Sequence, residues 1–137
     1  MRVYAVIDTN VLVSALLARS NSSPTVKVLD YLFQGLIVAV FNDDIISEYS
    51  SVLHREQFGF SEDAIVRVIQ AIRTGVSVKV ESMNTVLPDP KDVVFYEVAM
   101  TQNGSYLVTG NIKHFPKEAQ VVTPAEMVAI IEGVFPL

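Results

Sequence analysis

Apolar residues along this chain follow two kinds of spacing that alternate from one end to the other. The stretch Val3–Ile7 is apolar or aromatic at every position, and 36–41 repeats this pattern, so both predict buried strands. Other segments carry apolar residues three and four positions apart, which is typical of a helix with one buried face. Because strands and helices alternate, the pattern favours an α/β fold with a parallel sheet covered on both faces.

Capping and turn residues mark the limits of the predicted elements. The Ser-Pro pair at 23–24 is typical of a helix start, and Gly35 of a helix end. Asn10 is predicted to cap the helix after the first strand, and Thr123 to form a capping box with Glu126. The predicted helices cover 11–17, 24–34, 43–53, 61–72, 92–100 and a last segment from 124, and the predicted strands cover 3–7, 36–41, 76–80, 105–109 and 120–122.

Length and composition narrow the class of protein. The chain has 137 residues, half of them apolar, which fits one domain over 1–137 with its own core. It contains no cysteine, which excludes disulfides and thiolate zinc sites. No apolar run reaches the roughly 18 residues of a membrane span, and no signal-peptide pattern follows Met1, so a cytoplasmic location is expected.

The net charge of −5 argues against a simple nucleic-acid binder, since phosphate contacts require Lys and Arg. It does not exclude a nuclease, because several negative charges are expected to belong to a metal site. RNA is then expected to contact a local group of basic residues drawn from Arg19, Arg55, Lys91, Lys113 and Lys117. Arg19, Lys113 and the nearby His114 are the specific candidates for RNA contact.

Three acidic residues stand at the ends of predicted elements. Asp8 ends the first strand, Glu48 lies one turn into the third helix, and Asp92 opens a later helix. In open α/β sheets, ligands bind in the crevice outside the carboxyl ends of the strands. Acids gathered there without matching Lys or Arg repel one another, and a hard cation such as Mg²⁺ or Mn²⁺ relieves that repulsion. Asn111, after the strand at 105–109, offers a fourth polar group at the same edge.

In their order and spacing these residues resemble the PIN domain, a family of metal-dependent ribonucleases that includes many toxins of bacterial toxin–antitoxin pairs. The resemblance covers nearly the whole chain. It implies a three-layer α/β/α architecture around a parallel sheet of about four to five strands. It also implies that Asp8, Glu48 and Asp92 bind Mg²⁺ or Mn²⁺ and carry the catalysis. The motifs behind it are Asp8-Thr9-Asn10, Ile46-Ser47-Glu48, Asp89-Pro90-Lys91-Asp92, Leu107-Val108-Thr109-Gly110-Asn111 and Thr123-Pro124-Ala125-Glu126.

Several of these residues also have a structural interpretation. Asp89 competes with Asp92 but lies in a Pro-Asp-Pro turn, where Asp has ordinary structural uses, so Asp92 is preferred. Thr9 and Thr109 supply hydroxyls beside the acids or satisfy backbone groups. Asn111 stands where the family often has a fourth acid, which favours one ion over two, and it is also a common turn residue after glycine.

The resemblance implies an enzyme that hydrolyses phosphodiester bonds of RNA. Its implied partners are RNA, a cognate antitoxin and further copies of the chain in a homodimer or higher oligomer. The alternative is a PIN-fold RNA- or protein-binding module with a weakened catalytic site, because Asn111 replaces an acid. A metal-dependent phosphatase is disfavoured, since the chain lacks an Asp-x-Asp pattern. Three mutually repelling acids favour the nuclease, because a relic site has no reason to keep them.

Overall fold

The computed structural model describes residues 2–80 and 84–134. Within them, the helices and strands alternate as the sequence predicts. The elements are β1 (Val3–Ile7), α1 (Thr9–Leu17), α2 (Pro24–Gln34), β2 (Ile37–Phe41), α3 (Asp43–Leu53), the 3₁₀ helix η1 (Glu56–Phe58), α4 (Glu62–Arg73), β3 (Val76–Ser77), α5 (Asp92–Thr101), β4 (Tyr106–Val108), the 3₁₀ helix η2 (Ile112–His114), β5 (Val121–Val122) and α6 (Pro124–Val134).

The described strands form one five-stranded sheet in the order β3-β2-β1-β4-β5, and every neighbouring pair is parallel. In the central strand, Ala5 aligns with Ala39 of β2 on one side and with Tyr106 of β4 on the other. The chain first builds outward from β1 through β2 and β3, and then returns to add β4 on the opposite side of β1. This reversal creates a switch point at the carboxyl ends of β1 and β4, where open α/β sheets bind ligands.

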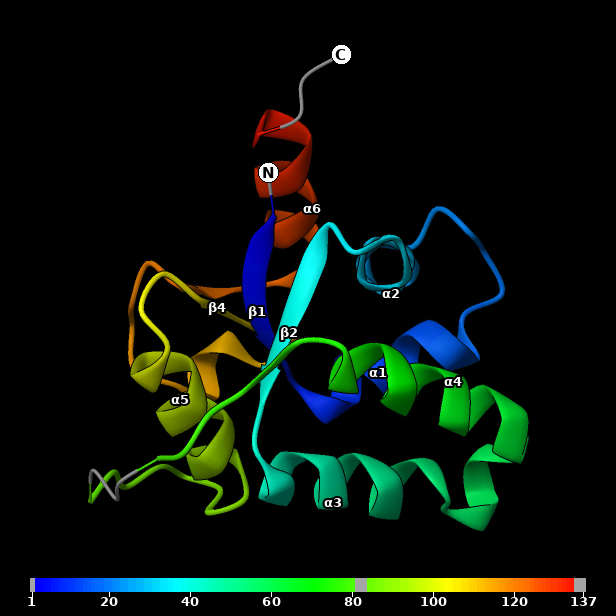
Figure 1. Ribbon diagram of the computed structural model, residues 1–137, viewed down its shortest axis with the longest axis horizontal. Coiled ribbons are helices and arrows are strands. Elements are labelled where there is room, and N and C mark those ends of the chain that lie inside the picture. The colour runs from blue at the N-terminus through cyan, green and yellow to red at the C-terminus, as the bar shows by residue number, and fades with distance from the viewer. Residues whose placement is uncertain (1, 81–83, 135–137) are drawn as a thin grey trace.

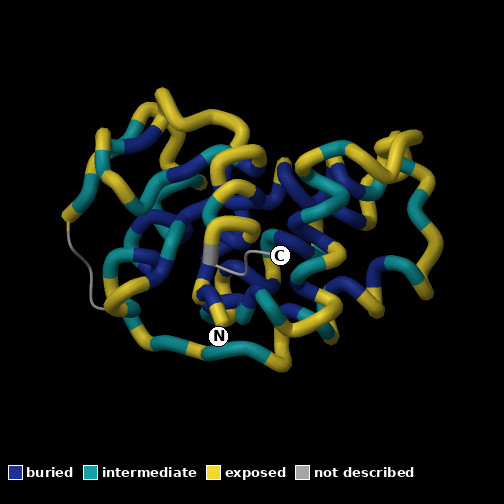
Figure 2. Tube along the Cα trace, turned by 90° about the horizontal axis from the view of Figure 1, so that it is seen from above, coloured by how far each residue is buried: buried dark blue, intermediate teal, exposed yellow. Residues whose placement is uncertain are grey.

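Helices cover both sides of this sheet, as the three-layer prediction requires. Figure 1 shows α5 on one side of the central strands and α2 with α4 on the other. The central strand is the most enclosed part of the core, because Ala5, Val6 and Ile7 are 0 % exposed. Figure 2 shows the buried trace running through the middle of the molecule, with exposed segments around it. The described residues contain no helix that is long and apolar enough to cross a membrane.

Most helix ends are fixed by the residues that the sequence analysis identified. Gly35 follows α2 with a φ of 78°, a left-handed conformation that glycine adopts without strain. The hydroxyl of Ser61 accepts a hydrogen bond from the amide of Ala64 at the start of α4. Thr123 and Glu126 exchange reciprocal hydrogen bonds at 2.9 and 3.1 Å, which confirms the predicted capping box.

Two local predictions are wrong. Asn10 does not cap the first helix, because α1 begins at Thr9 and the amide of Val11 already bonds to the carbonyl of Asp8. The cap position therefore belongs to Asp8. The strand predicted over 76–80 is limited to Val76–Ser77, because its partner β2 ends at Phe41 and the chain turns into α3 directly afterwards.

Candidate active site

Asp8 lies directly at the switch point of the sheet. Its amide donates to the carbonyl of Val108 over 2.9 Å, which ties the residue after β1 to the end of β4. Its Oδ2 accepts a 2.7 Å hydrogen bond from the hydroxyl of Thr109, and that hydroxyl accepts a 3.0 Å bond from the amide of Asn111. The Asp8 side chain makes no capping hydrogen bond to α1. The carboxylate is thus oriented by the segment that follows β4.

A buried tyrosine holds the three acid-bearing elements together. Tyr49 is 0 % exposed, and its hydroxyl donates to the carbonyl of Ile7, the residue before Asp8. Its ring also packs against Phe95 of α5, with centroids 6.0 Å apart and planes tilted by 50°. Because Tyr49 follows Glu48 on α3, one side chain links β1, α3 and α5. The sequence offered a signal for this contact, since a tyrosine within an apolar helix stripe needs a partner for its hydroxyl.

Asp92 enters the site at the first residue of α5. The preceding turn is closed by Asp89, whose Oδ1 accepts from the amide of Lys91 at 3.0 Å and whose carbonyl accepts from the amide of Asp92 at 3.0 Å. Asp89 therefore has the structural role expected of it. The Asp92 side chain is 16 % exposed, and its Oδ2 lies 3.7 Å from Nδ1 of His114 on η2.

The three acids line one cavity of about 190 Å³ at the carboxyl edge of the sheet. Figure 1 shows that α3 and the beginning of α5 lie on the side of the molecule to which β1 and β2 run. The walls come from segments that are far apart in the sequence, and the residues that line them are Asp8, Thr9, Asn10, Glu48, Val52, Arg55, Asp89, Lys91, Asp92 and Phe95. The motifs that the sequence analysis singled out for chemistry thus meet in space.

Comparison with known proteins bears on this arrangement. A PIN-domain family model matches residues 4–113, a range that contains Asp8, Glu48 and Asp92 and most of the chain. The chain belongs to the PIN-domain family. No curated protein and no solved structure matches it. PIN domains are generally nucleases and typically use divalent metal ions, so the fold of this chain is a nuclease-type fold.

In this PIN domain, the acids of the cavity are electrostatically coupled. Burial raises the pKa of Asp8 above its ordinary value, against the hydrogen bond from Thr109, the neighbouring amides and the charge of His114. Burial also raises the pKa of Asp92, and the negative charges of Asp8 and then Asp89 raise it further. The pKa of the Tyr49 hydroxyl is raised by burial and by Asp8. Negative charge in the cavity is therefore unfavourable until a cation offsets it.

Two basic residues of the PIN-domain cavity were not singled out in advance. Arg55 and Lys91 line the same cavity as the acids. Both belong to the five basic residues from which an RNA-contacting group was expected, but neither was among the specific candidates. Glu48 and Val52 lie four residues apart on one face of α3, whereas Arg55 lies after the end of that helix, so helical spacing does not predict its place. Lys91 immediately precedes Asp92.

The other candidate residues do not line this cavity. Asn111 is exposed and does not line it, although its amide supports Thr109. His114 does not line the cavity, but its Nδ1 lies 3.7 Å from Oδ2 of Asp92, which does. Lys113 lines a second cavity instead, and the exposed Arg19, beyond the end of α1, lines neither. The cavity thus combines Asp8, Glu48 and Asp92 with Arg55 and Lys91, and Thr109 contacts it through its hydrogen bond to Asp8.

The donor set fits a hard divalent cation. Asp8, Glu48 and Asp92 offer carboxylate oxygens, and the buried Thr9 hydroxyl on the same wall has no hydrogen-bond partner among the described residues. Within 2–80 and 84–134, no three His, Cys, Asp or Glu side chains lie close enough together to hold a metal ion jointly. Mg²⁺ typically binds through one or two carboxylates and keeps several waters, so two of these acids would be enough to hold it.

Proposed function

We propose that this PIN-domain protein is a Mg²⁺- or Mn²⁺-dependent endoribonuclease. The observation that carries the proposal is that Asp8, Glu48 and Asp92 line one cavity together with Arg55 and Lys91. Carboxylates alone repel RNA, and basic residues alone bind it without cleaving it. A site that brings both to one cavity is suited to a phosphate held beside a divalent cation.

The proposed roles follow from where each side chain lies. Asp8 and Asp92 would hold the cation, and Thr109 keeps Asp8 oriented through its hydrogen bond. When bound, the cation polarises a phosphoryl oxygen and makes water a stronger nucleophile at neutral pH. Glu48, which is half-buried on α3, accepts the proton of the attacking water.

The basic residues complete the proposed reaction. Arg55 and Lys91 attract the phosphate into a cavity that would otherwise be wholly acidic. The leaving oxygen takes a proton from solvent. Water has access to the cavity here, because His114 lies exposed beside Asp92 and does not enclose it. The products are two shorter RNA strands.

The test is cleavage of a mixed-sequence RNA with and without Mn²⁺. We expect cleavage by the wild type that EDTA abolishes and added Mn²⁺ restores. Asp8→Asn and Asp92→Asn should each lower the rate by at least about 100-fold, because each removes a charged ligand. Asp63→Asn is the matched control, since Asp63 is an exposed acid in the first turn of α4 and does not line the cavity. Cleavage that survives EDTA or Asp8→Asn contradicts the proposal.

A second function is favoured by two observations: Asn111 is neutral and exposed, and no three acidic side chains among the described residues lie close enough to hold a metal ion together. It is a PIN-fold module that binds RNA or protein without cleaving it. The same assay separates the two functions. A wild type that binds the RNA, shows no Mn²⁺-dependent cleavage and has an unchanged RNA affinity after Asp8→Asn would establish the binding module.

We further propose that the protein is the toxin of a toxin–antitoxin pair that acts on cytoplasmic RNA, with a cognate antitoxin as protein partner and self-association into a dimer or higher oligomer. The proposal rests on PIN-domain membership. Expression in a bacterial host tests it. The wild type should arrest growth and Asp8→Asn should not, and co-expression of the neighbouring open reading frame should restore growth. Light scattering of the purified protein tests the oligomer.

A further inference from the structure

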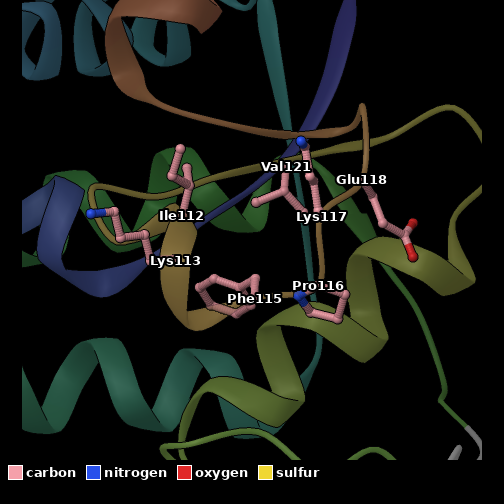
Figure 3. A pocket seen from close by; sticks show the side chains of 7 residues that line it. All are labelled: Ile112, Lys113, Phe115, Pro116, Lys117, Glu118 and Val121. Atoms are coloured by element: carbon pink, nitrogen blue, oxygen red, sulfur yellow. The ribbon is translucent and has the colours of Figure 1, made fainter.

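A second cavity lies beyond β4, and it differs in chemistry from the acidic one. Its volume is about 380 Å³, within the size range of small-molecule sites, which begins near 300 Å³. Figure 3 shows the apolar side chains of Ile112, Phe115, Pro116 and Val121 converging on it. Ile112 is 42 % exposed, so this apolar wall is open to solvent.

The polar groups of this cavity carry net positive charge toward solvent. Lys113 and Lys117 flank the apolar side chains in Figure 3, and neither has an ion-pair partner among the described residues. Glu118 also lines the cavity, but its Oε1 accepts a 2.8 Å hydrogen bond from the hydroxyl of Tyr96 on α5. Figure 3 shows Glu118 pointing away from the apolar group, toward that helix. An occupant therefore meets an apolar surface between two unpaired lysines.

The two cavities are separated by a single residue of η2. His114 lies 3.7 Å from the carboxylate of Asp92, whereas its neighbours Lys113 and Phe115 line the second cavity. The segment 113–115 therefore borders the second cavity on both sides of the residue that contacts Asp92 in the acidic cavity. A ligand with an apolar face and a regularly charged backbone matches both cavities in turn.

We propose that this second cavity, which we name the flanking-nucleotide pocket, binds the nucleotide next to the scissile phosphate of a single-stranded RNA. The base lies on the apolar wall, and Lys113 and Lys117 contact the phosphates on either side of it. This combination of a basic track with surfaces for bases is the usual design of single-strand binding sites. The inference rests on the proposed ribonuclease function, and the charge of the pocket favours RNA because this chain is otherwise acidic, with a net charge of −5.

The experiment measures binding of a fluorescein-labelled mixed-sequence RNA in EDTA, where no cleavage occurs. The Lys113→Gln/Lys117→Gln double variant should raise Kd roughly tenfold at low salt. It should also reduce the slope of log K against log salt by roughly 1.4, taking about 0.7 for each phosphate that a lysine no longer neutralises. Ile112→Ala should raise Kd about threefold to fivefold with an unchanged slope, because it removes apolar surface and no charge. Lys79→Gln, at an exposed lysine elsewhere, is the matched control and should bind as wild type.

The outcomes separate this inference from the proposed function. Wild-type affinity in the double-lysine variant overturns the flanking-nucleotide pocket, even where Mn²⁺-dependent cleavage is observed. Lysine-dependent RNA binding without any cleavage overturns the ribonuclease and supports the pocket as an RNA site. A labelled poly-glutamate peptide is measured in parallel. If it binds more tightly than the RNA and depends on the same lysines, the occupant is an acidic protein segment and the inference is wrong.

Discussion

Asp8 is 5 % exposed, so its carboxylate is buried. Almost all of the groups that interact with this carboxylate are neutral. The hydroxyl of Thr109 and the backbone amides beside Asp8 stabilise its negative charge, but burial outweighs them and the pKa is raised. Asp8 stands at the cap position of α1, beside the amides of Thr9 and Asn10, but its side-chain hydrogen bond goes to Thr109 in the segment after β4. This geometry places the Asp8 carboxylate on the wall of the acidic cavity.

The raised pKa values of Asp8 and Asp92 predict how the metal-free protein responds to pH. A raised pKa means that the folded state holds the proton more tightly than the unfolded state does. The contribution of these two groups to the free energy of unfolding should therefore be fully present below the ordinary value of 3.8 and should be lost as pH rises through the raised values. In Asp8→Asn the fall should be smaller, because only Asp92 still contributes, and the variant should be at least as stable as wild type at neutral pH.

Urea denaturation in EDTA between about pH 4 and pH 7 measures this dependence. Asp63→Asn serves again as the control with wild-type behaviour. An Asp8→Asn variant that loses stability at every pH would instead make Asp8 a structural residue of the β1–α1 turn. An unchanged pH dependence would exclude Asp8 as the group responsible.

At the scale of elements, the site depends on contacts that hold β1, α3 and α5 in one arrangement. Each acid comes from a different element, and Tyr49 contacts all three through its own helix, the carbonyl of Ile7 and the ring of Phe95. The hydroxyl of Tyr49 touches neither metal nor substrate in the proposed reaction. It is a positioning residue.

Tyr49→Phe should keep the packing and lose the hydrogen bond to Ile7. We expect a loss of stability of about 1–3 kcal/mol, since a buried carbonyl loses a donor. We also expect a lower kcat with an unchanged KM, because the acids are displaced while the RNA-binding surface remains. Steady-state RNA cleavage measures both constants. Tyr31→Phe on α2, remote from the acids, is the control. A Tyr49→Phe enzyme with wild-type kcat would limit Tyr49 to a role in stability.

Gly75, at the junction of α4 and β3, lies so close to the backbone of β2 that a side chain there should lower stability. A Cβ atom added there would lie 2.0 Å from the carbonyl oxygen of Ala39 on β2, so the backbone would have to move. Gly75→Ala should therefore lower the free energy of unfolding by about 1–3 kcal/mol. Gly133→Ala is the matched control, because an added Cβ meets no atom within 4 Å there. It should be neutral or stabilising, since alanine is the better helix former. Equal urea midpoints for the two variants would contradict this account.

The limits of an element were predicted well where the signal lies within the element itself. They were predicted less well where they depend on a neighbouring element. The periodicity and caps predicted both ends of α2 and α4 and the start of α6 closely, because each signal lies within or beside the helix itself. The length of β3 was overestimated, since it is limited by the end of β2. The three acids were found through motifs that each lie within a few residues. The role of Tyr49 and the choice of Arg55 and Lys91 depend on tertiary contacts that no local pattern contains.

At the scale of the whole molecule, the PIN fold gathers like charges at one edge of its sheet. In the absence of metal, the resulting repulsion lowers the free energy of unfolding, and the packing of the core offsets this loss. A cation bound at the site should remove part of that repulsion. The central claim, that Asp8 and Asp92 bind a divalent cation in the cavity that Glu48 also lines, therefore has a consequence for global stability that needs no knowledge of the RNA.

The most direct test is urea denaturation of the wild type, Asp8→Asn and Asp63→Asn over a titration of Mn²⁺ at neutral pH. A ligand that binds only the folded state at a hundredfold excess over its Kd stabilises it by about 2.7 kcal/mol. We predict stabilisation of this size for the wild type and for Asp63→Asn, and little or none for Asp8→Asn. If Mn²⁺ stabilises none of the three proteins, or all three equally, the acids do not form the metal site.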